Sequence, residues 1–557
     1  MTQEPGTGRG GRPEPGSIDE LIAATAPAAA RPLAGLVGRL RAAGLVTAAR
    51  RDDLAAGLGA LDAIEVRGLA EDSRAVRPGT LFVAVPGFHV DGHDYVARAA
   101  AAGAAAAIVE HAVPGAAVPQ LVVTSTRTAL AQAAGWWSGD PSRDLGVVGI
   151  TGTDGKTTTS FLAVAAFEAA GLSAGLIGTV ETKVGAVRER HEAHVTTPGA
   201  PELQATLRAM TLLGNAVAVV ETTSHALELE RVAGTAYDAA IFTNLTHEHL
   251  ELHGTFERYR AAKLRLFGLL AEGIDNPAKT VGGRPWPKLA VINRDDPAAS
   301  WFEAAAREAG ATVRTYGTDP SADVRATTVE EDAHRLRVGF AGAAGAGRLD
   351  LRLAGRFNVH NALAVVALGE GLGLDPAAVR AGLEGVAGVP GRMERIDAGQ
   401  PFGVIVDYAH SPASLQGVLE LLAPIAAARG GGLIAVFGSG GERDTAKRAV
   451  MGRIAGERCR LVVAADEDPR GEDRYAIVEE IVRGAESAGR RRGVDVLGIV
   501  DRREAIETAL DHARPGDVVL LAGKGHEPTI LYADHALPWD EAAVARETLA
   551  AMGYEAG

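Results

Sequence analysis

From residue 145 onward, the chain is dominated by short apolar segments that each run into a polar or glycine-rich loop. LGVVGIT enters GTDGKTTT, AVAVVE enters TTSHAL, AAIFTN enters LTHEHLELHG, and LAVIN enters RDDP. Repeated strand, loop and helix is typical of βαβ units with mainly parallel sheets. In such sheets ligands bind at the carboxyl ends of the strands, where these polar loops lie. The pattern predicts an α/β fold.

The length and the changes of pattern indicate several domains. At about 100–200 residues per domain, 557 residues correspond to three domains. The strand-and-loop pattern starts near residue 140, and a second alternation follows the linker GVAGVPG near 388. A Gly/Pro-rich start is expected to be disordered, and the Ala/Leu-rich residues 18–60 are expected to be helical. The expected units are 1–60, 61–140, 141–388 and 389–557.

Composition excludes several classes of protein. The net charge of −14 disfavours nucleic acid or an anionic membrane as a general partner. The single cysteine, Cys459, excludes an internal disulfide and a cysteine-based zinc site. No apolar run approaches the roughly 20 residues that span a bilayer, and the N-terminal segment lacks the apolar stretch of a signal peptide. We therefore expect a cytoplasmic protein without a membrane span.

Lysine is rare in this chain, with only seven lysines among 56 basic residues. Because arginine stands almost everywhere else, the remaining lysines are enriched for positions where a guanidinium cannot substitute. Lys156, Lys263, Lys447 and Lys524 lie in the motifs described below. Chance is the alternative explanation.

The segment Gly152–Thr158 follows an apolar strand and precedes a helical stretch. Backbone N–H groups of such a loop cradle phosphates, with Lys156 reaching the β/γ-phosphates and the Thr157 hydroxyl binding Mg²⁺. A plain glycine turn is the alternative. Five residues separate Gly149 from Gly155, where the generic loop has four. This spacing, and the lack of a guanine-reading NKxD string, disfavour a motor or GTPase.

TGTDGKTT closely resembles the ATP loop of the Mur ligase family and of the related folylpolyglutamate synthetase. The resemblance covers roughly residues 60–555, and its motifs occur in the order found in the tripeptide-synthetase (MurE) branch. They are AEDSRAVRPGTLFVAVPG with VDGHDY, VTTPGAPEL, VVETTSHALELERV, FTNLTHEHLELHG, RAAKLRLF, GRFNVHN, GVPGRMERI, VDYAHSP, GERDTAKR, DEDPR and GKGHE. The family implies three domains: a UDP-substrate domain, a central ATP-binding domain with a parallel sheet, and a C-terminal Rossmann-like domain.

Glu221 ends an otherwise apolar strand, which is an unfavourable place for a charge unless the carboxylate meets a cation. In the family the matching glutamate binds Mg²⁺; an exposed strand end is the alternative. The resemblance implies His249 as a second metal ligand, whereas a lone histidine is more often structural. This chain has Glu248 and Glu251 where the family usually has Asp, which puts the loop geometry in doubt.

Lys263 shares a predicted helical face with apolar residues, so its ammonium either snorkels to solvent or is functional. The apolar residues are Phe256, Tyr259, Leu266, Phe267 and Leu270. In the family the matching lysine is carbamylated and becomes a carboxylate-like metal ligand. The resemblance therefore implies Thr157, Glu221, His249 and carbamylated Lys263 as the metal site, and Lys156, Lys263, Glu221 and His249 as the catalytic set.

The resemblance also implies the residues that bind ATP and the sugar nucleotide; for the scattered polar residues among them, loop capping is the alternative role. The ATP set is Gly152, Thr153, Asp154, Gly155, Lys156, Thr157, Thr158, Asn293, Asn358, Asn361, Arg392, Glu394 and Asp407. The UDP-muramoyl-dipeptide set is Ser73, Thr196, Thr197, Thr223 and Arg231. Leu229 stands where the family often has glutamine, so one polar contact is missing.

The amino-acid substrate is expected in the last domain. The matching residues are Arg443, Glu467, Asp468, Pro469, Arg470, Gly523 and Glu527. The family's usual Asp-Asn-Pro-Arg is Glu467-Asp468-Pro469-Arg470 here, a departure at the place that reads the substrate side chain. Arg470 suits a distal carboxylate, whereas the added acid could attract a bare ammonium.

The resemblance implies an ATP- and Mg²⁺-dependent ligase of peptidoglycan synthesis in the cytoplasm, acting as a monomer. It joins a diamino acid to UDP-N-acetylmuramoyl-L-alanyl-D-glutamate through an acyl phosphate. We expect meso-2,6-diaminopimelate, with L-ornithine or L-lysine as alternatives. Folylpolyglutamate synthetase is the nearest rival, but it needs no UDP domain. A P-loop motor or switch, or a non-catalytic binding module, fits the motifs less well.

Overall fold

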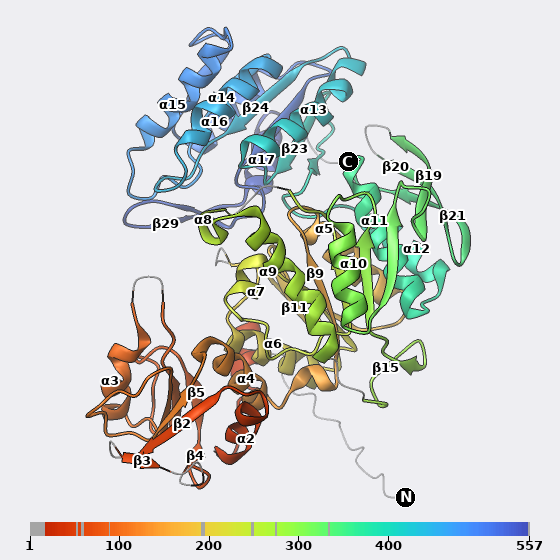
Figure 1. Cartoon of the computed structure of the whole chain (residues 1–557). Coiled ribbons are helices and arrows are strands. Elements are labelled where there is room, and N and C mark those ends of the chain that lie inside the picture. Colours follow the sequence, from red (N-terminus) through yellow and green to blue (C-terminus); the bar gives the residue numbers. More distant parts are fainter. Residues whose placement is uncertain are drawn as a thin grey trace, which may run out of the picture.

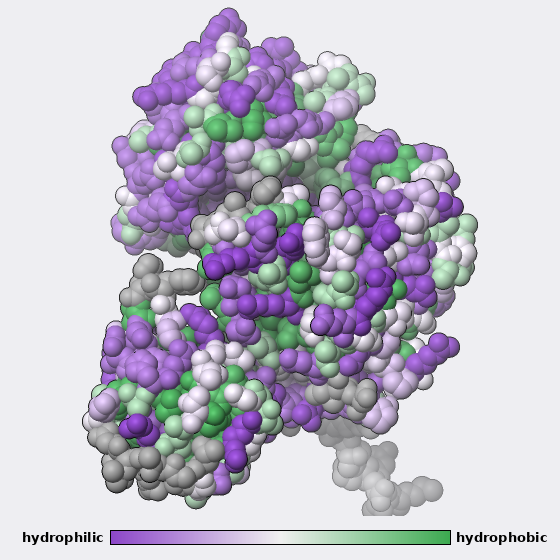
Figure 2. Space-filling model, in the orientation of Figure 1, coloured by the Kyte–Doolittle hydropathy of each residue, from purple (hydrophilic) through white to green (hydrophobic). Residues whose placement is uncertain are grey.

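The computed structural model describes residues 17–51, 54–56, 59, 61–87, 90–190, 195–246, 250–272, 276–331 and 335–554. Figure 1 shows three bodies in chain order, with the N-terminal and C-terminal bodies at opposite ends of the central one. Figure 2 shows that hydrophilic residues cover most of the C-terminal body on the face in view. In the described part of the chain, no helix has the length and apolar character needed to cross a membrane.

The N-terminal body is built on a six-stranded sheet whose central strands are parallel. In sheet order the strands are β3 (Leu54–Ala56), β2 (Val46–Arg51), β8 (Gln120–Val123), β7 (Ala106–Val109), β6 (Thr80–Val83) and β5 (Gly68–Ala70). Its helices are α2 (Ala34–Ala42), α3 (Val96–Ala101) and α4 (Thr126–Ser138). Helix α1 (Ile18–Ala23) instead contributes Ile18 and Leu21 to an apolar core of the central body. Short, fully buried strands such as β6–β8 are typical of a sheet covered on both faces.

The expectation of a helical extension over residues 18–60 is wrong in part. Helices α1 and α2 form, but β2 pairs antiparallel with β8 and joins the N-terminal sheet. The sequence VTAARR of β2 has no strong strand preference, and its pairing with residues 120–123 is a tertiary effect that outweighs local propensity. The N-terminal body therefore starts before residue 61.

The central body is built on an eleven-stranded sheet with a parallel middle and antiparallel edges. In order the strands are β12 (Val187–Arg190), β11 (Glu181–Val184), β10 (Ala174–Ile177), β13 (Val217–Glu221), β9 (Gly146–Thr151), β14 (Ala239–Phe242), β17 (Leu289–Asn293), β18 (Thr312–Gly317), β19 (Val324–Glu331), β20 (Leu336–Gly342) and β21 (Gly345–Leu351). The predicted run of parallel strands with polar loops is confirmed here.

Helices cover both faces of this sheet, each over its own apolar core. One core contains residues of α5 (Lys156–Ala169), α11 (Phe357–Leu372) and α12 (Pro376–Gly385). The other contains residues of α6 (Ala200–Leu212), α9 (Phe256–Gly268) and α10 (Ala299–Glu308). Two short helices, α7 (Ser224–Glu228) and α8 (Leu250–His253), lie in the loops after β13 and β14.

The C-terminal body is a six-stranded, mainly parallel sheet with helices on both faces. In order the strands are β22 (Glu394–Ile396), β23 (Gly403–Asp407), β27 (Val518–Ala522), β24 (Leu433–Phe437), β25 (Leu461–Ala464) and β26 (Val496–Gly498). The helices are α13 (Pro412–Ala428), α14 (Ala446–Arg458), α15 (Arg474–Ser487), α16 (Arg502–Asp511) and α17 (Glu541–Ala551). The predicted three-domain α/β architecture with a Rossmann-like last domain is confirmed.

Candidate active site

The phosphate-binding loop lies between β9 and α5, at the carboxyl end of an inner, parallel strand of the sheet. Gly152 and Gly155 have φ values of 153° and 81°. A Cβ atom at Gly152 would lie 1.8 Å from the Thr243 hydroxyl, and one at Gly155 would lie 2.4 Å from Asn361 Oδ1. Only glycine fits at either place. The loop therefore brings its backbone close to its neighbours and leads directly into the N-terminus of α5, an anion-binding arrangement.

Neighbouring loops hold the phosphate-binding loop in place. Asn244 accepts two hydrogen bonds from the backbone of this loop. Thr153 N donates to Asn244 O at 2.8 Å, and Asp154 N donates to Asn244 Oδ1 at 2.9 Å. The Thr243 hydroxyl donates to Asp154 O at 2.6 Å. The loop is therefore braced by the segment that follows β14.

Two lysine ammonium groups converge on one loop carbonyl. Lys156 Nζ donates to Gly152 O at 2.9 Å and to Thr153 O at 2.8 Å. Lys263 Nζ, on α9, donates to Gly152 O at 2.7 Å. Lys263 is only 1% exposed and its Nζ lies 4.5 Å from the centre of the Tyr259 ring. A buried ammonium does not snorkel to solvent, so the snorkelling alternative does not apply to Lys263.

The Glu221 carboxylate is completely buried at the end of β13 and is surrounded by donors. Thr157 Oγ1 donates to Oε2 at 2.9 Å, and Thr179 donates to the same carboxylate from its hydroxyl at 2.9 Å and its N–H at 3.0 Å. Glu221 is therefore not an exposed strand end. The sequence reasoning missed Thr179, although its position just after β10 follows the same rule as the other site residues.

A carboxylate and a hydroxyl beside a phosphate loop are the hard oxygen donors that Mg²⁺ prefers, with phosphates and water completing its shell. Thr157 and Glu221 therefore fit this ion. In the described part of the chain, no group of three or more His, Cys, Asp and Glu residues is arranged to hold a metal. His249 and Glu248 lie outside the described residues, and Glu251 is described only in its backbone.

The sugar-nucleotide residues of the central body adjoin Glu221. Thr197 Oγ1 donates to Glu221 O at 2.7 Å and lies 3.2 Å from the Thr223 hydroxyl, and Arg231 Nη1 donates to Thr197 O at 3.0 Å. The Thr196 hydroxyl lies 3.0 Å from that of Thr179. The Thr223 side chain also caps the N-terminus of α7, which is the role that the loop-capping alternative predicted. These groups therefore line one continuous edge beside the phosphate loop.

Arg231 lies at the junction between the N-terminal and central bodies. Burial lowers the pKa of Arg231, and the carboxylate of Glu71 partly opposes this effect. Burial likewise raises the pKa of Glu71. Ser73 is buried in the N-terminal body, two residues from Glu71. The sequence reasoning missed Glu71, because only the fold brings it toward Arg231.

The residues predicted near adenine and ribose all lie in the central body. Asn361 Nδ2 donates to Asn358 Oδ1 at 2.9 Å next to Gly155, and Asn293 Nδ2 donates to Thr243 O at 2.7 Å. Thr158 is buried in the first turn of α5. These residues are assembled around the loop.

Arg392 and Asp407 belong to the C-terminal body. Asp407 accepts from Met393 N at 2.8 Å and from Ala409 N at 2.9 Å, and burial raises its pKa. Arg392 lies over the Tyr408 ring, and Glu394 accepts from Gly391 N at 2.9 Å. Within the described residues, none of these side chains hydrogen-bonds to the phosphate loop.

Most of the predicted amino-acid residues follow the carboxyl ends of β25 and β27, where Lys524 is fully buried, whereas Arg443 follows β24. Lys524 Nζ contacts Asp468 Oδ1 at 2.8 Å and Glu527 Oε2 at 2.6 Å. The sequence reasoning noted Lys524 as a rare lysine but not as a member of this site. Its ammonium neutralises the acid that replaces the expected asparagine.

Arg470 has a left-handed backbone, with φ of 52°, after Pro469. Its Nη1 donates to Gly441 O at 3.1 Å, whereas its Nη2 lies 4.0 Å from Asp468 Oδ2. Gly523, with φ of 101°, packs against Glu467, and Arg443 is exposed. Because Asp468 is bonded mainly to Lys524, the guanidinium of Arg470 keeps donors for another carboxylate.

The glycine-rich loop on the central parallel sheet defines a P-loop nucleotide-binding protein with three α/β domains. Three family descriptions match the chain: "Mur ligase family, catalytic domain" at residues 65–136, "Mur ligase middle domain" at 150–369, and "Mur ligase, glutamate ligase domain" at 391–525. The chain belongs to the Mur ligase family, and it is an ATP-dependent, ADP-forming ligase.

Relatives with high coverage carry specific names. UDP-N-acetylmuramyl-tripeptide synthetase of Roseiflexus sp. (strain RS-1) is 50% identical over 501 residues, which cover 88% of this chain and 96% of that protein. UDP-N-acetylmuramoyl-L-alanyl-D-glutamate--2,6-diaminopimelate ligase of Geobacter metallireducens (strain ATCC 53774 / DSM 7210 / GS-15) is 42% identical, with coverage of 84% and 90%. A solved structure of a ligase with the latter name is 28% identical, with a TM-score of 0.63 and coverage of 89% and 96%.

Proposed function

We propose that this chain joins meso-2,6-diaminopimelate to UDP-N-acetylmuramoyl-L-alanyl-D-glutamate in peptidoglycan synthesis. The observation that carries the proposal is that the predicted ATP site and the predicted sugar-nucleotide site adjoin each other in the central body. Thr157 and Glu221 adjoin the phosphate loop, and the Thr197 hydroxyl contacts the Glu221 carbonyl oxygen at 2.7 Å. A sugar nucleotide held by Thr196, Thr197, Thr223 and Arg231 would therefore place its terminal carboxylate beside the γ-phosphate of ATP.

Two bond exchanges complete the reaction. The substrate carboxylate attacks the γ-phosphorus of ATP, which forms an acyl phosphate and releases ADP. The amino group of the diamino acid then attacks the acyl carbon, phosphate leaves, and the amine loses a proton. The protein contributes positioning and charge neutralisation, as phosphoryl transfer requires. Lys156 neutralises the β/γ-phosphates, and the buried site strengthens that interaction.

Thr157 and Glu221 would hold Mg²⁺, with His249 and carbamylated Lys263 as the further ligands that the family resemblance implies. When bound, the ion neutralises charge on the transferring phosphoryl group. Lys263 supports this proposal because its Nζ is buried beside the loop rather than directed to solvent. A carbamate there would replace a cation by a carboxylate-like anion, and anionic oxygen is the ligand type that Mg²⁺ prefers.

Arg470 supports meso-diaminopimelate as the amino acid. Its guanidinium is only loosely paired with Asp468, which is bonded to Lys524. Arginine pairs with a carboxylate through two charge-assisted hydrogen bonds, so Arg470 suits the distal carboxylate of this substrate. One observation favours L-ornithine or L-lysine: Glu467 Oε2 is buried without a hydrogen-bond partner, and a distal ammonium would satisfy it.

Three further assignments belong to this proposal. We place the reaction in the cytoplasm, where ATP and the free amino acid are available, and we assign a monomer because one chain carries every residue of the site. We place domain limits near 140 and 388, which lie between α4 and β9 and between α12 and β22.

The test is ADP release with UDP-muramoyl-dipeptide and a panel of amino acids. We expect ADP release only when both the sugar nucleotide and a diamino acid are present, with one tripeptide formed per ADP. ADP release with a folate acceptor and glutamate would support a folylpolyglutamate synthetase instead. ATP turnover that is independent of any acceptor would support a motor or switch.

A further inference from the structure

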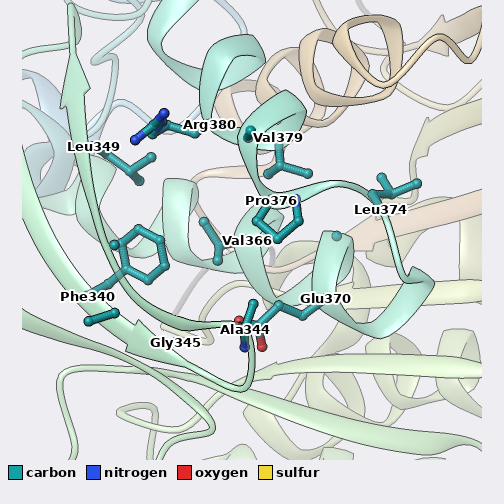
Figure 3. A pocket seen from close by; sticks show the side chains of 14 residues that line it. Phe340, Ala344, Gly345, Leu349, Val366, Glu370, Leu374, Pro376, Val379 and Arg380 are labelled. Atoms are coloured by element: carbon teal, nitrogen blue, oxygen red, sulfur yellow. Dashed lines mark hydrogen bonds between the residues drawn. The ribbon is translucent and has the colours of Figure 1, made fainter.

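A cavity of about 200 Å³ lies in the central body between the β20–β21 hairpin and the helices α11 and α12 (Figure 3). Apolar side chains form its walls: Phe340 and Leu349 from the hairpin, Val366 from α11 and Val379 from α12. One water molecule occupies roughly 30 Å³ in the liquid, so the cavity has the volume of about seven water molecules, which suits a small ligand. None of its lining residues belongs to the active site described above.

Two charged residues stand on opposite sides of the cavity, as Figure 3 shows. The Glu370 carboxylate accepts hydrogen bonds from Ala343 N at 3.1 Å and Ala344 N at 3.2 Å, so the hairpin turn already satisfies it. Arg380 is exposed, and within the described residues its guanidinium forms no hydrogen bond or ion pair. The cavity thus combines an apolar interior with one available cation at its edge.

We propose that this cavity is a second ligand site, which binds a compact apolar carboxylate. The apolar part of the ligand would fill the space between Phe340, Val366 and Val379, where removal from water favours binding. Its carboxylate would pair with Arg380, because a guanidinium forms charge-assisted, bidentate hydrogen bonds with that group. Glu370 would repel a carboxylate from the opposite side and so fix the orientation of the ligand.

The same two helices connect this cavity with the ATP loop. Helix α11 carries Val366 in the cavity wall and, five residues earlier, Asn361, whose Oδ1 accepts a hydrogen bond from Thr159 at 3.3 Å. Helix α12 packs on α5 so closely that a Cβ atom at Gly382 would lie 2.5 Å from Ala165 O. A ligand that contacts both helices therefore acts on the elements that hold the loop. The proposal includes this coupling, which is reciprocal by thermodynamic linkage.

Isothermal titration of the full chain with octanoate, and with octan-1-ol for comparison, tests the site. We expect octanoate to bind more tightly than octan-1-ol, and Arg380→Gln to weaken octanoate about fivefold without changing the affinity for octan-1-ol. Arg352→Gln is the matched control, because Arg352 is exposed nearby but does not line the cavity. An octanoate affinity that is equal in Arg380→Gln and in the unaltered chain would overturn the proposal.

The coupling has its own measurement, which is the Kd for ADP with and without saturating octanoate. We expect a change of about fivefold that reaches a plateau, and an equal effect of ADP on the octanoate Kd. Complete displacement of octanoate by ADP would mean that octanoate occupies the ATP site, and an unchanged ADP Kd would overturn the coupling. Binding is measured without turnover, so the outcome is independent of the proposed ligase substrate.

Discussion

The ammonium group of Lys263 lies 2.7 Å from the carbonyl oxygen of Gly152, which also accepts a hydrogen bond from Lys156. This contact ties helix α9 to the first glycine of the ATP loop. Lys263 therefore sits where a modification of its side chain would act directly on the nucleotide site. The two lysines can be tested separately because they have different chemical roles.

Lys156→Ala should abolish ligation while the fold survives. The ammonium group of Lys156 would neutralise the β/γ-phosphates of ATP. The loss of such a preorganised group lowers the rate of the chemical step on the order of 10³-fold. ADP release measures the effect, and thermal unfolding checks the fold. Lys288→Ala is the control, because Lys288 is a partly exposed lysine that donates to Ala271 O and lies outside the site described above. Unchanged turnover in Lys156→Ala would remove the assignment of the ATP loop.

Lys263→Ala should lose most activity, on the order of 10²-fold as for other lost catalytic groups, and should recover part of it with added acetate or formate. Lys263→Arg should fail as well, because a guanidinium can keep the hydrogen bond to Gly152 but cannot form a carbamate. Initial rates of ADP release with and without the added acid provide the measurement, and Lys288→Arg is the control. Full activity in Lys263→Arg would show that the cation alone is sufficient.

The protein should lose stability in mild acid because of the buried His526 in the GKGHE segment. Burial lowers its pKa to about 3, from an ordinary value of 6.5, with Arg392 as the next cause. The unfolded chain therefore binds a proton that the folded chain excludes, and stability falls as pH drops from 6.5 toward 3. Between pH 7 and pH 5 the loss is about 2 kcal/mol.

Urea unfolding at pH 7 and pH 5 measures this contribution. His526→Gln should remove it, so the pH dependence of the free energy of unfolding should shrink by about 2 kcal/mol. His512→Gln is the control, because His512 is exposed. If His526→Gln keeps the pH dependence of the unaltered chain, as the control His512→Gln should, the pKa of His526 is not lowered in the folded state.

The order of strands and loops could be predicted because parallel βαβ units have a local signature. LGVVGIT was expected as a strand and forms β9, and the following loop and helix are in place. The strand β2 could not be predicted, since only its pairing with β8 distinguishes VTAARR from a helical segment. Local preference is weak there, and a non-local sheet decides the conformation.

The site could be predicted where one motif carries several of its residues. The loop Gly152–Thr158 is such a motif, and Glu221 was recognisable as a charge at the end of an apolar strand. The sequence did not reveal which distant segments contact one another in the fold. Thr179 reaches Glu221 only because β10 lies beside β13, and Lys524 meets Asp468 only because their loops follow strands of one sheet.

The identity of the amino acid depends on how the acidic group at Asp468 is neutralised. Lys524 is buried and contacts Asp468 at 2.8 Å, so the extra carboxylate is compensated within the protein and Arg470 keeps donors for substrate. We therefore expect kcat/KM to be highest for meso-diaminopimelate among meso-diaminopimelate, L-lysine and L-ornithine. A site built around a paired polar group discriminates strongly against analogues that lack the partner, on the order of 10⁴-fold.

Arg470→Ala should lower kcat/KM for meso-diaminopimelate and leave the values for L-lysine and L-ornithine almost unchanged. Arg453→Ala, which removes an exposed arginine of α14 in the same domain, is the comparison. If L-ornithine or L-lysine is the better substrate and Arg470→Ala keeps that selectivity, Arg470 does not read the side chain, and the unpaired oxygen of Glu467 becomes the group that selects a distal ammonium.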